Sequence, residues 1–255
     1  MTDLFDLTGR RAIVTGGSAG IGLGMARGLA GKGAAVAIVG RDGAKAEAAA
    51  RTLRDSGGQA IALSADVASE ADCARIVAEA AEALGGVDIL VNNAGTNVRK
   101  PPEDYTLDEW KSLIDTNLTS AFVLSQAVFP YMKEGGGGRI INIGSMTSLF
   151  GAPFAAPYSA TKGGILQLTK ALAAAWAKHG ICVNAVLPGW IDTTLTEQLR
   201  KDVPHINDAV LARTPAARWG RPDDFEGIAV FLASPASAFV TGAAIPVDGG
   251  YSANA

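Results

Sequence analysis

The residues best suited to chemistry are Tyr158 and Lys162, four positions apart in a stretch expected to be helical. Residues at this spacing share one face of a helix, so the phenol and the ammonium should be neighbours. A cation beside a phenol stabilises the phenolate and lowers a pKa that is ordinarily about 10. The pair therefore predicts a tyrosine that exchanges protons, although an idle surface pair would have the same spacing.

Three other segments supply polar groups to this pair. Ser145 ends an apolar run and could donate a hydrogen bond to a substrate oxygen. Asn117 lies in an otherwise apolar stretch, where a buried amide needs partners such as a water or a lysine. Residues 92–95, Asn-Asn-Ala-Gly, add two amides and a flexible turn. Together these groups favour a catalytic role for the tyrosine and the lysine.

The segment VTGGSAGIG, residues 14–22, permits two interpretations. One is the G-x-S-x-G elbow of a serine hydrolase with Ser18 as nucleophile, which needs a histidine and an acid. The histidines of the chain, His179 and His205, stand at a helix end and in a polar segment, so this interpretation is disfavoured. The other is a loop whose glycines at 16, 20 and 22 let the backbone approach the phosphates of a dinucleotide. An ordinary strand-to-helix turn would also explain the glycines.

Short β-branched runs alternate with longer alanine-rich amphipathic stretches, which predicts repeated βα units. Most of the runs are continuously apolar, as in strands covered on both faces of a parallel sheet. No linker divides the chain, so residues 1–255 are expected to form one doubly wound α/β (Rossmann) domain of about seven strands with helices on both faces. The expected strands are 11–15, 35–39, 59–63, 87–91, 138–143, 182–187 and 243–247, and the expected helices are 21–32, 43–56, 69–84, 107–133, 157–179 and 222–233.

The candidate residues gather after the ends of these expected strands. The glycine loop follows the first strand, Asp66 the third, residues 92–95 the fourth, Ser145 the fifth and Pro188 the sixth. Ligands of doubly wound sheets bind at the carboxyl ends of the strands. Five separate loops should therefore converge on one binding site.

In their order and spacing, these motifs resemble those of the short-chain dehydrogenase/reductase family, and the match spans essentially the whole chain. The resemblance implies hydride transfer between a nicotinamide and a secondary alcohol or ketone. The implied catalytic tetrad is Asn117, Ser145, Tyr158 and Lys162. In it the tyrosine exchanges the proton, the serine steadies the substrate oxygen, the lysine holds the ribose and tunes the tyrosine, and the asparagine positions the lysine through water. Cofactor contacts are expected at Gly16, Ser18, Gly20, Ile21, Gly22, Arg41, Asp66, Val67, Asn93, Ala94, Gly95, Tyr158, Lys162, Pro188, Gly189, Ile191 and Thr193.

The end of the second expected strand bears on the choice between NAD and NADP. An acidic residue there accepts hydrogen bonds from the ribose 2′-OH of NAD, whereas an arginine neutralises the 2′-phosphate of NADP. Gly40 occupies the position of that acid and Arg41 follows it, which favours NADP(H). Ala19 stands where many NADP-dependent relatives have a second basic residue, and Asp42 lies nearby, so NAD(H) stays an alternative.

Two further segments, together with the serine and tyrosine of the tetrad, are expected to contact the substrate. Arg99 and Lys100 follow the Asn-Asn-Ala-Gly turn and could clamp a carboxylate, although a solvated loop pair would look the same. Trp190 opens a segment, residues 190–215, whose length and position suit a lid over the substrate. The indole could stack on a sugar or anchor the lid. Trp219 is expected to pack in a structured turn.

Several segments are similar to sugar-acid members of the family, the gluconate 5-dehydrogenases and 2-deoxygluconate 3-dehydrogenases. They include residues 24–30, 176–179 and 215–220 and the arginine after the Asn-Asn-Ala-Gly turn. The resemblance implies a gluconate-type sugar acid or a polyol as substrate. Two alternatives stay open: a 3-oxoacyl thioester reductase, whose overall pattern is nearly the same, and a non-catalytic cofactor-binding scaffold or sensor.

The composition limits which class of protein and which partners are expected. Of the 255 residues, 48% are hydrophobic and 18% charged, which predicts a packed core rather than disorder. A formal charge of −3 gives no reason to expect nucleic-acid or anionic-membrane partners. Cys73 and Cys182 lack the spacing of a disulfide framework or a metal site, and the acidic first residues differ from a signal peptide. We expect a cytoplasmic enzyme without a metal, and the resemblance implies a homotetramer.

Overall fold

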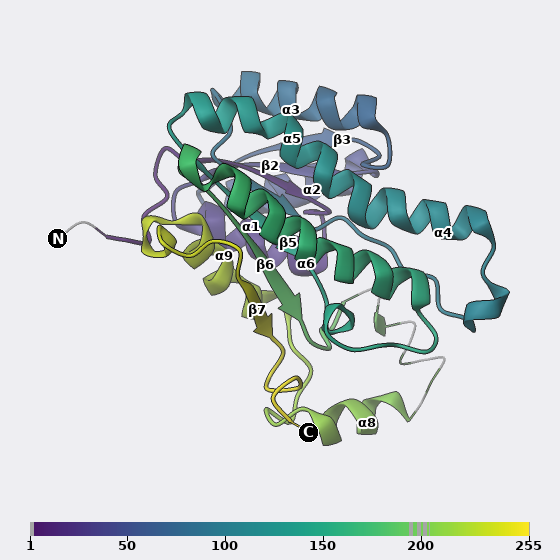
Figure 1. Ribbon diagram of the computed structural model, residues 1–255. Coiled ribbons are helices and arrows are strands. Elements are labelled where there is room, and N and C mark those ends of the chain that lie inside the picture. Colours follow the sequence, from purple (N-terminus) through teal and green to yellow (C-terminus); the bar gives the residue numbers. More distant parts are fainter. Residues whose placement is uncertain (1–2, 194–195, 198–199, 201–202, 204, 255) are drawn as a thin grey trace.

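One sheet of seven parallel strands organises the molecule, in the order β3-β2-β1-β4-β5-β6-β7 (Figure 1). The computed structural model describes residues 3–193, 196–197, 200, 203 and 205–254. The strand order reverses between β1 and β4, and the ligand crevice of such a sheet lies at this switch point. The expected doubly wound α/β fold is confirmed. The strands are β1 (Arg11–Thr15), β2 (Ala35–Gly40), β3 (Gln59–Ser64), β4 (Ile89–Asn92), β5 (Gly138–Ile143), β6 (Ile181–Pro188) and β7 (Ala244–Val247).

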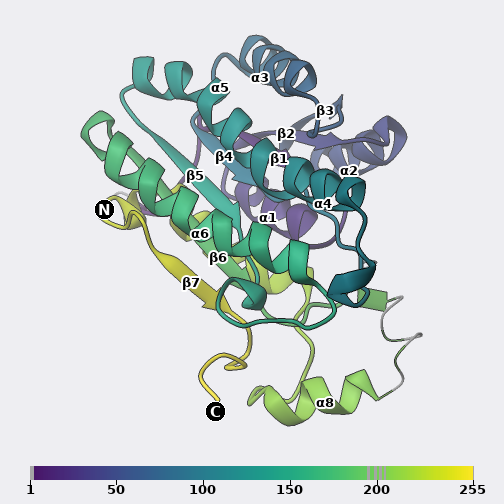
Figure 2. The same cartoon turned by 45° about the vertical axis from the view of Figure 1, so that its right-hand side comes forward.

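Helices cover both faces of the sheet, as Figures 1 and 2 show. Successive side chains of a strand point to opposite faces, so β1 sends Ala12 and Val14 into one core and Ile13 into the other. The first core is covered by α1, α2 and α9, and the second by α3, α5 and α6. These helices are α1 (Gly20–Gly31), α2 (Gly43–Asp55), α3 (Glu70–Leu84), α5 (Ser120–Glu134), α6 (Ala156–Trp176) and α9 (Glu226–Ala233).

Close packing fixes the helix that follows the glycine loop. A Cβ atom built on Gly28 in α1 would lie 2.7 Å from the carbonyl oxygen of Glu226 in α9, which leaves no room for a side chain. The two helices therefore meet backbone against backbone. This contact fixes α1, the helix that begins at the carboxyl end of β1, against α9.

The helix expected at 107–133 is interrupted. It consists of α4 (Leu107–Ile114), a π-helical segment η2 (Asp115–Thr119) and α5. Its beginning agrees with the sequence, because Thr106 and Glu109 form a capping box. Hydrophobic periodicity does not reveal a π segment, which holds one wide turn inside an otherwise regular helix and often marks a functional site.

A further helix, α8 (Ile206–Arg213), lies within the segment expected to be a lid and was not predicted. It is short and lacks a strong apolar face, with Val210 as its one fully buried side chain. Residues 194–195, 198–199, 201–202 and 204 of the expected lid lie outside the described residues. The 3₁₀ turns are η1 (Pro102–Asp104), η3 (Met146–Ser148), η4 (Ala177–His179), η5 (Pro222–Phe225) and η6 (Pro235–Ser237).

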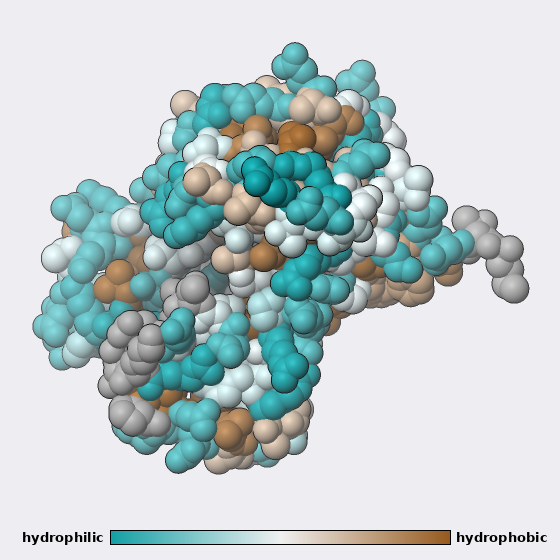
Figure 3. Space-filling view, turned by 180° about the vertical axis from the view of Figure 1, so that it is seen from behind, coloured by the Kyte–Doolittle hydropathy of each residue, from teal (hydrophilic) through white to brown (hydrophobic). Residues whose placement is uncertain are grey.

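The surface mixes residue types. In Figure 3, hydrophobic residues are interspersed with hydrophilic ones over the face opposite to that of Figure 1. No helix in the described ranges combines the length and the apolar character that crossing a membrane requires.

Candidate active site

A cavity of about 530 Å³ opens at the carboxyl ends of the central strands. Four of the five expected loops line it, those that follow β1, β4, β5 and β6. The loop that begins at Asp66, after β3, contributes no lining residue and lies farther along the same edge of the sheet. The convergence predicted from the sequence is thus confirmed for four loops, whereas the fifth lies outside the cavity on the same edge of the sheet.

Ser145, Tyr158 and Lys162 all line this cavity. Ser145 stands just after β5, where its Oγ accepts a hydrogen bond from the amide of Thr147 at 3.1 Å. Tyr158 lies in the first turn of α6, and the Lys162 ammonium is 5.5 Å from the centroid of its ring. The two side chains are therefore neighbours on one helix face, as their spacing predicts.

The lysine is held by the sheet. Lys162 is 4% exposed, and its Nζ donates a 2.7 Å hydrogen bond to the carbonyl oxygen of Ile143 at the end of β5. Burial lowers the pKa of Lys162 to about 8, because an ammonium loses its hydration there. The ammonium is thus both fixed in position and easier to deprotonate than an exposed lysine.

The pKa of Tyr158 departs from the sequence-based expectation. Burial raises the pKa of its phenol, while a hydrogen bond with Ser145 and the charge of Arg99 act to lower it. The expected lowering by Lys162 is absent from the causes that act on Tyr158 in the described chain. The helical spacing placed the ammonium near the ring but could not show that burial would outweigh its charge.

Asn117 lies in the π segment η2 and is 2% exposed. Its Oδ1 accepts a hydrogen bond from the amide of Thr96 at 2.8 Å, and its Nδ2 donates to the carbonyl oxygen of the same residue at 2.9 Å. The side chain therefore clamps the loop after β4 rather than contacting the lysine directly. A Cβ built on Gly95 would lie 3.2 Å from Asn117 Oδ1 and 3.8 Å from Lys162 Nζ, so both groups lie beside this glycine.

The glycine loop turns at Gly16 and Gly20, whose φ angles of 61° and 54° disfavour any residue with a side chain. Asn93 stabilises the loop, because its Nδ2 donates hydrogen bonds to the carbonyl oxygens of Thr15 at 2.9 Å and of Gly16 at 3.1 Å. Both donors of this amide are thereby engaged. Thr15 joins the two loops, because its Oγ1 accepts hydrogen bonds from the amides of Asn93 and Ala94 at 3.0 and 3.1 Å.

The hydrolase interpretation of this loop finds no support in the geometry. His179 packs edge-on against Phe129 at 5.5 Å and precedes β6, at the opposite end of the sheet from the cavity. Among the described residues, neither histidine lines the cavity. Ser18 therefore lacks the histidine of a hydrolase triad in the described part of the site.

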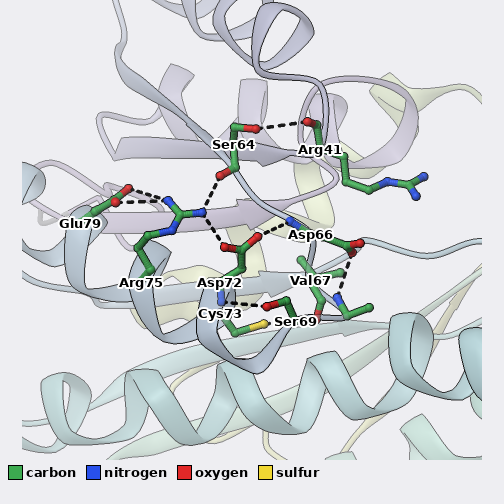
Figure 4. Close-up of polar contacts among 10 residues, drawn as sticks. Arg41, Ser64, Asp66, Val67, Ser69, Asp72, Cys73, Arg75 and Glu79 are labelled. Carbon is green, nitrogen blue, oxygen red and sulfur yellow. Dashed lines mark hydrogen bonds and ion pairs between the residues drawn. The ribbon is translucent and has the colours of Figure 1, made fainter.

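A second polar cluster lies at the carboxyl ends of β2 and β3 and is drawn in Figure 4. Ser64 Oγ donates to the carbonyl oxygen of Arg41 at 3.1 Å, which ties the ends of the two strands together. Asp72 Oδ2 accepts from the amide of Asp66 at 2.8 Å. Arg75 donates to Asp72 Oδ1 and to the carbonyl oxygen of Ser64, each at 2.9 Å.

This cluster holds the exposed Asp66 and the buried Val67 in a fixed turn, and the side chain of Arg41 extends away from the hydrogen-bonded residues (Figure 4). The sequence pointed to Arg41 and Asp66 but missed Asp72 and Arg75, which stand in the first turns of α3 and whose contacts depend on the fold.

Only some of the residues expected to contact the substrate line the cavity. Arg99 and Trp190 line the cavity, whereas Lys100 pairs with Glu109 at 2.6 Å and lies over the ring of Tyr105. Lys100 is therefore directed to α4, and the clamp expected from the adjacent pair is wrong for this residue. Trp219 is buried and meets Trp190 edge-to-face at 5.7 Å, so its expected packing role is confirmed.

Several lining residues were not anticipated, among them Phe150, Arg213 and Tyr251. These three come from the segment after η3, the end of α8 and the C-terminal segment. No motif connects them in the sequence, because the fold alone brings these distant segments together.

Residues 16–252 match the family model described as Enoyl-(Acyl carrier protein) reductase. Together with the relatives below, this match shows that the chain belongs to the short-chain dehydrogenase/reductase family, whose members transfer hydride between NAD(P) and CH–OH groups. The resemblance drawn from the motifs is thereby confirmed, and the protein is an NAD(P)-dependent oxidoreductase.

The similarity extends along the whole chain. Gluconate 5-dehydrogenase of Gluconobacter oxydans (strain 621H) is 42% identical over 248 residues, 97% of this chain and 96% of that relative. 5-keto-D-gluconate 5-reductase of Escherichia coli (strain K12) is 40% identical over 250 residues, 98% of each chain. A gluconate 5-dehydrogenase from Burkholderia cenocepacia J2315, solved in complex with NADP and tartrate, is 44% identical with a TM-score of 0.94 over 99% of each chain.

Proposed function

We propose that this protein interconverts a hydroxyl and a keto group on a gluconate-type sugar acid, with NADP(H) as the preferred cofactor. The observation that carries the proposal is the charge of the cavity. Arg99, Lys162 and Arg213 line it, and in the described part of the chain no aspartate or glutamate does. A cavity with only cationic charges suits an anionic substrate beside an anionic cofactor.

The relatives support the same substrate class. Those reported above are named for gluconate or 5-keto-D-gluconate, and the solved one holds tartrate, a small hydroxy acid, together with NADP. A 3-oxoacyl thioester reductase, the main alternative, is not favoured by these names.

Within the site, we assign the proton transfer to Tyr158, which exchanges its hydroxyl proton with the substrate oxygen. Ser145 donates a hydrogen bond to that oxygen and, through its contact with the phenol, favours the phenolate. Lys162 holds its charge at the end of β5 beside the tyrosine. Asn117 fixes the loop after β4, and we retain as a proposal that it also positions the lysine through water.

The residues present fit a dinucleotide. Gly16 and Gly20 form a positive-φ loop at the N-terminus of α1, where backbone amides favour a pyrophosphate. When bound, the cofactor supplies the acceptor or donor of hydride. A Cβ built on Gly40 would lie 3.3 Å from Ser18 Oγ, so an aspartate at this position would crowd the serine, and its charge would repel a phosphate. We therefore assign the 2′-phosphate to the neighbourhood of Ser18 and Arg41 and the adenine to that of Asp66.

Other parts of the proposal concern the whole molecule. We propose that residues 1–255 act as one cofactor-binding domain with residues 190–215 as the substrate lid. The small residues of α5 and α6 suit close packing between subunits of a homotetramer. A cytoplasmic location completes the proposal.

A substrate panel tests the function. Gluconate, 2-deoxygluconate, neutral polyols and an acetoacetyl thioester are offered with NADP(H) or NAD(H), and the absorbance of the reduced nicotinamide is followed. We expect the highest kcat/KM with a sugar acid and NADP(H). A higher value with the thioester would favour the reductase alternative, and tight cofactor binding without any absorbance change would favour a non-catalytic scaffold.

A further inference from the structure

Arg213, the last residue of α8, is held between two aromatic rings beside the cavity. Its guanidinium carbon lies 4.4 Å from the ring centroid of Tyr251 and 5.2 Å from that of Phe150. Its Nη1 also donates to the Tyr251 hydroxyl at 3.3 Å. Since all three residues line the cavity, the planar cation is oriented beside the space that a substrate would fill.

These contacts orient the charge without neutralising it. Other cations around the site are paired with carboxylates: Lys100 with Glu109, Arg218 with Asp224 and Arg200 with Asp192. Among the described residues Arg213 has no acidic partner, although its guanidinium presents several N–H donors in a fixed plane. A planar guanidinium of this kind matches the two oxygens of a carboxylate.

Arg213 and Arg99 approach the cavity from different elements. Arg99 stands in the loop after β4, and its positive charge acts to lower the pKa of Tyr158. Arg213 stands at the end of α8 and is not among the charges of the described residues that act on that phenol. The two arginines can therefore contact different parts of one substrate.

We propose that Arg213 binds the carboxylate of the substrate in this cavity, and so selects acids over neutral substrates of the same carbon number. The inference rests on the proposed function, because it names the residue that recognises the acid group of that substrate. Arg99 then acts near the reacting carbon, where its charge favours the phenolate whether or not the substrate is an acid.

The test compares D-gluconate with D-glucitol, a neutral polyol of the same carbon number, in Arg213→Gln. Loss of a charge-assisted contact should raise KM for gluconate about 10- to 100-fold and leave KM for glucitol within about threefold. KM for NADP⁺ should stay within about twofold, which separates a substrate contact from a phosphate contact. Arg213→Lys keeps the charge but loses the planar fork, so an intermediate rise is expected. Arg51→Gln on α2, at an exposed position distant from the cavity, is the matched control.

Equal rises of KM for both substrates in Arg213→Gln, or no rise for gluconate, would overturn the inference. It would also fall if Arg99→Gln, and not Arg213→Gln, discriminated between the acid and the polyol. A second readout does not need turnover: gluconate is titrated into the enzyme with bound NADPH while the intrinsic tryptophan fluorescence is recorded, to which Trp190 in the cavity contributes.

If the wild-type protein oxidises no sugar acid, the proposed function fails and the binding titration decides the inference alone. Gluconate binding that Arg213→Gln weakens about tenfold or more would support it. Binding that the substitution leaves unchanged, or no gluconate binding to the wild-type protein, would overturn it.

Discussion

The two sides of the cavity are built in different ways. On the side of the sheet, Lys162 and Asn117 are almost fully buried, and each is held by short hydrogen bonds to the backbone of a strand end or loop. On the side of the lid, Arg213 and Phe150 are exposed, and aromatic contacts hold the cation. The groups that support proton transfer by Tyr158 are therefore fixed by the core, whereas the groups assigned to substrate selection rest on surface segments.

This difference suggests how the family can vary its substrates. A buried, hydrogen-bonded centre tolerates little change, because an orphaned buried polar group costs about 1–3 kcal/mol. A cation held by ring contacts at the surface can be exchanged with a smaller loss of stability. Substitutions on the sheet side should thus change turnover, and substitutions on the lid side should change which substrate the enzyme prefers.

The largest effect is expected from Tyr158→Phe on the sheet side. Removing the hydroxyl removes the proton exchange, so kcat should fall about 10³-fold or more while the dissociation constant of NADPH stays within about twofold. Steady-state kinetics and a fluorescence titration measure the two quantities. Tyr131→Phe on α5, at the surface, should retain full activity; near-full activity of Tyr158→Phe would remove the assignment.

Lys162→Met tests the burial of the ammonium. The pKa of Lys162 in the folded protein, about 8, lies below its ordinary value, so the unfolded chain binds more protons between pH 8 and about 10.5. The stability of the ligand-free protein relative to Lys162→Met should therefore rise with pH across this window, by about 3 kcal/mol in total. Urea unfolding at several pH values measures it. For Lys170→Met, at an exposed position of α6, the free energy of unfolding should change with pH as it does in the wild type. The same pH dependence in Lys162→Met would contradict the burial argument.

Gly40→Asp addresses the cofactor rim. The new carboxylate would crowd Ser18 and repel a 2′-phosphate, yet it could accept a hydrogen bond from the 2′-OH of NAD. We expect the ratio of kcat/KM for NADP⁺ to that for NAD⁺ to fall about 30-fold or more. Gly40→Ala separates size from charge and should shift the ratio much less. An unchanged ratio in Gly40→Asp would place the 2′-phosphate elsewhere.

The smallest effect is expected from Lys100→Met. The ion pair of Lys100 with Glu109 is partly exposed, so its loss should lower the free energy of unfolding by no more than about 1 kcal/mol. Because Lys100 is directed away from the cavity, KM for gluconate should stay within about twofold. A large rise of KM would restore Lys100 as a substrate contact and would blur the division between the two sides.

Local patterns in the sequence carried much of this description. Continuous apolar runs identified the buried parallel strands, and the four-residue spacing of Tyr158 and Lys162 placed both on one face of α6. The rule that ligands bind at the carboxyl ends of the strands then located the cavity. These features follow from neighbours in the chain or from a general property of parallel sheets, so they need no coordinates.

Tertiary structure alone decided the rest. The π segment around Asn117, the pairing of Lys100 with Glu109 and the placing of Arg213 between Phe150 and Tyr251 all depend on contacts that local periodicity does not encode. The direction of the pKa change at Tyr158 likewise depends on how deeply the fold buries the phenol, since loss of hydration there outweighs the favourable contacts. The sequence determined which groups could react, and the packing of distant segments determined how each group is charged and which of them meets the substrate.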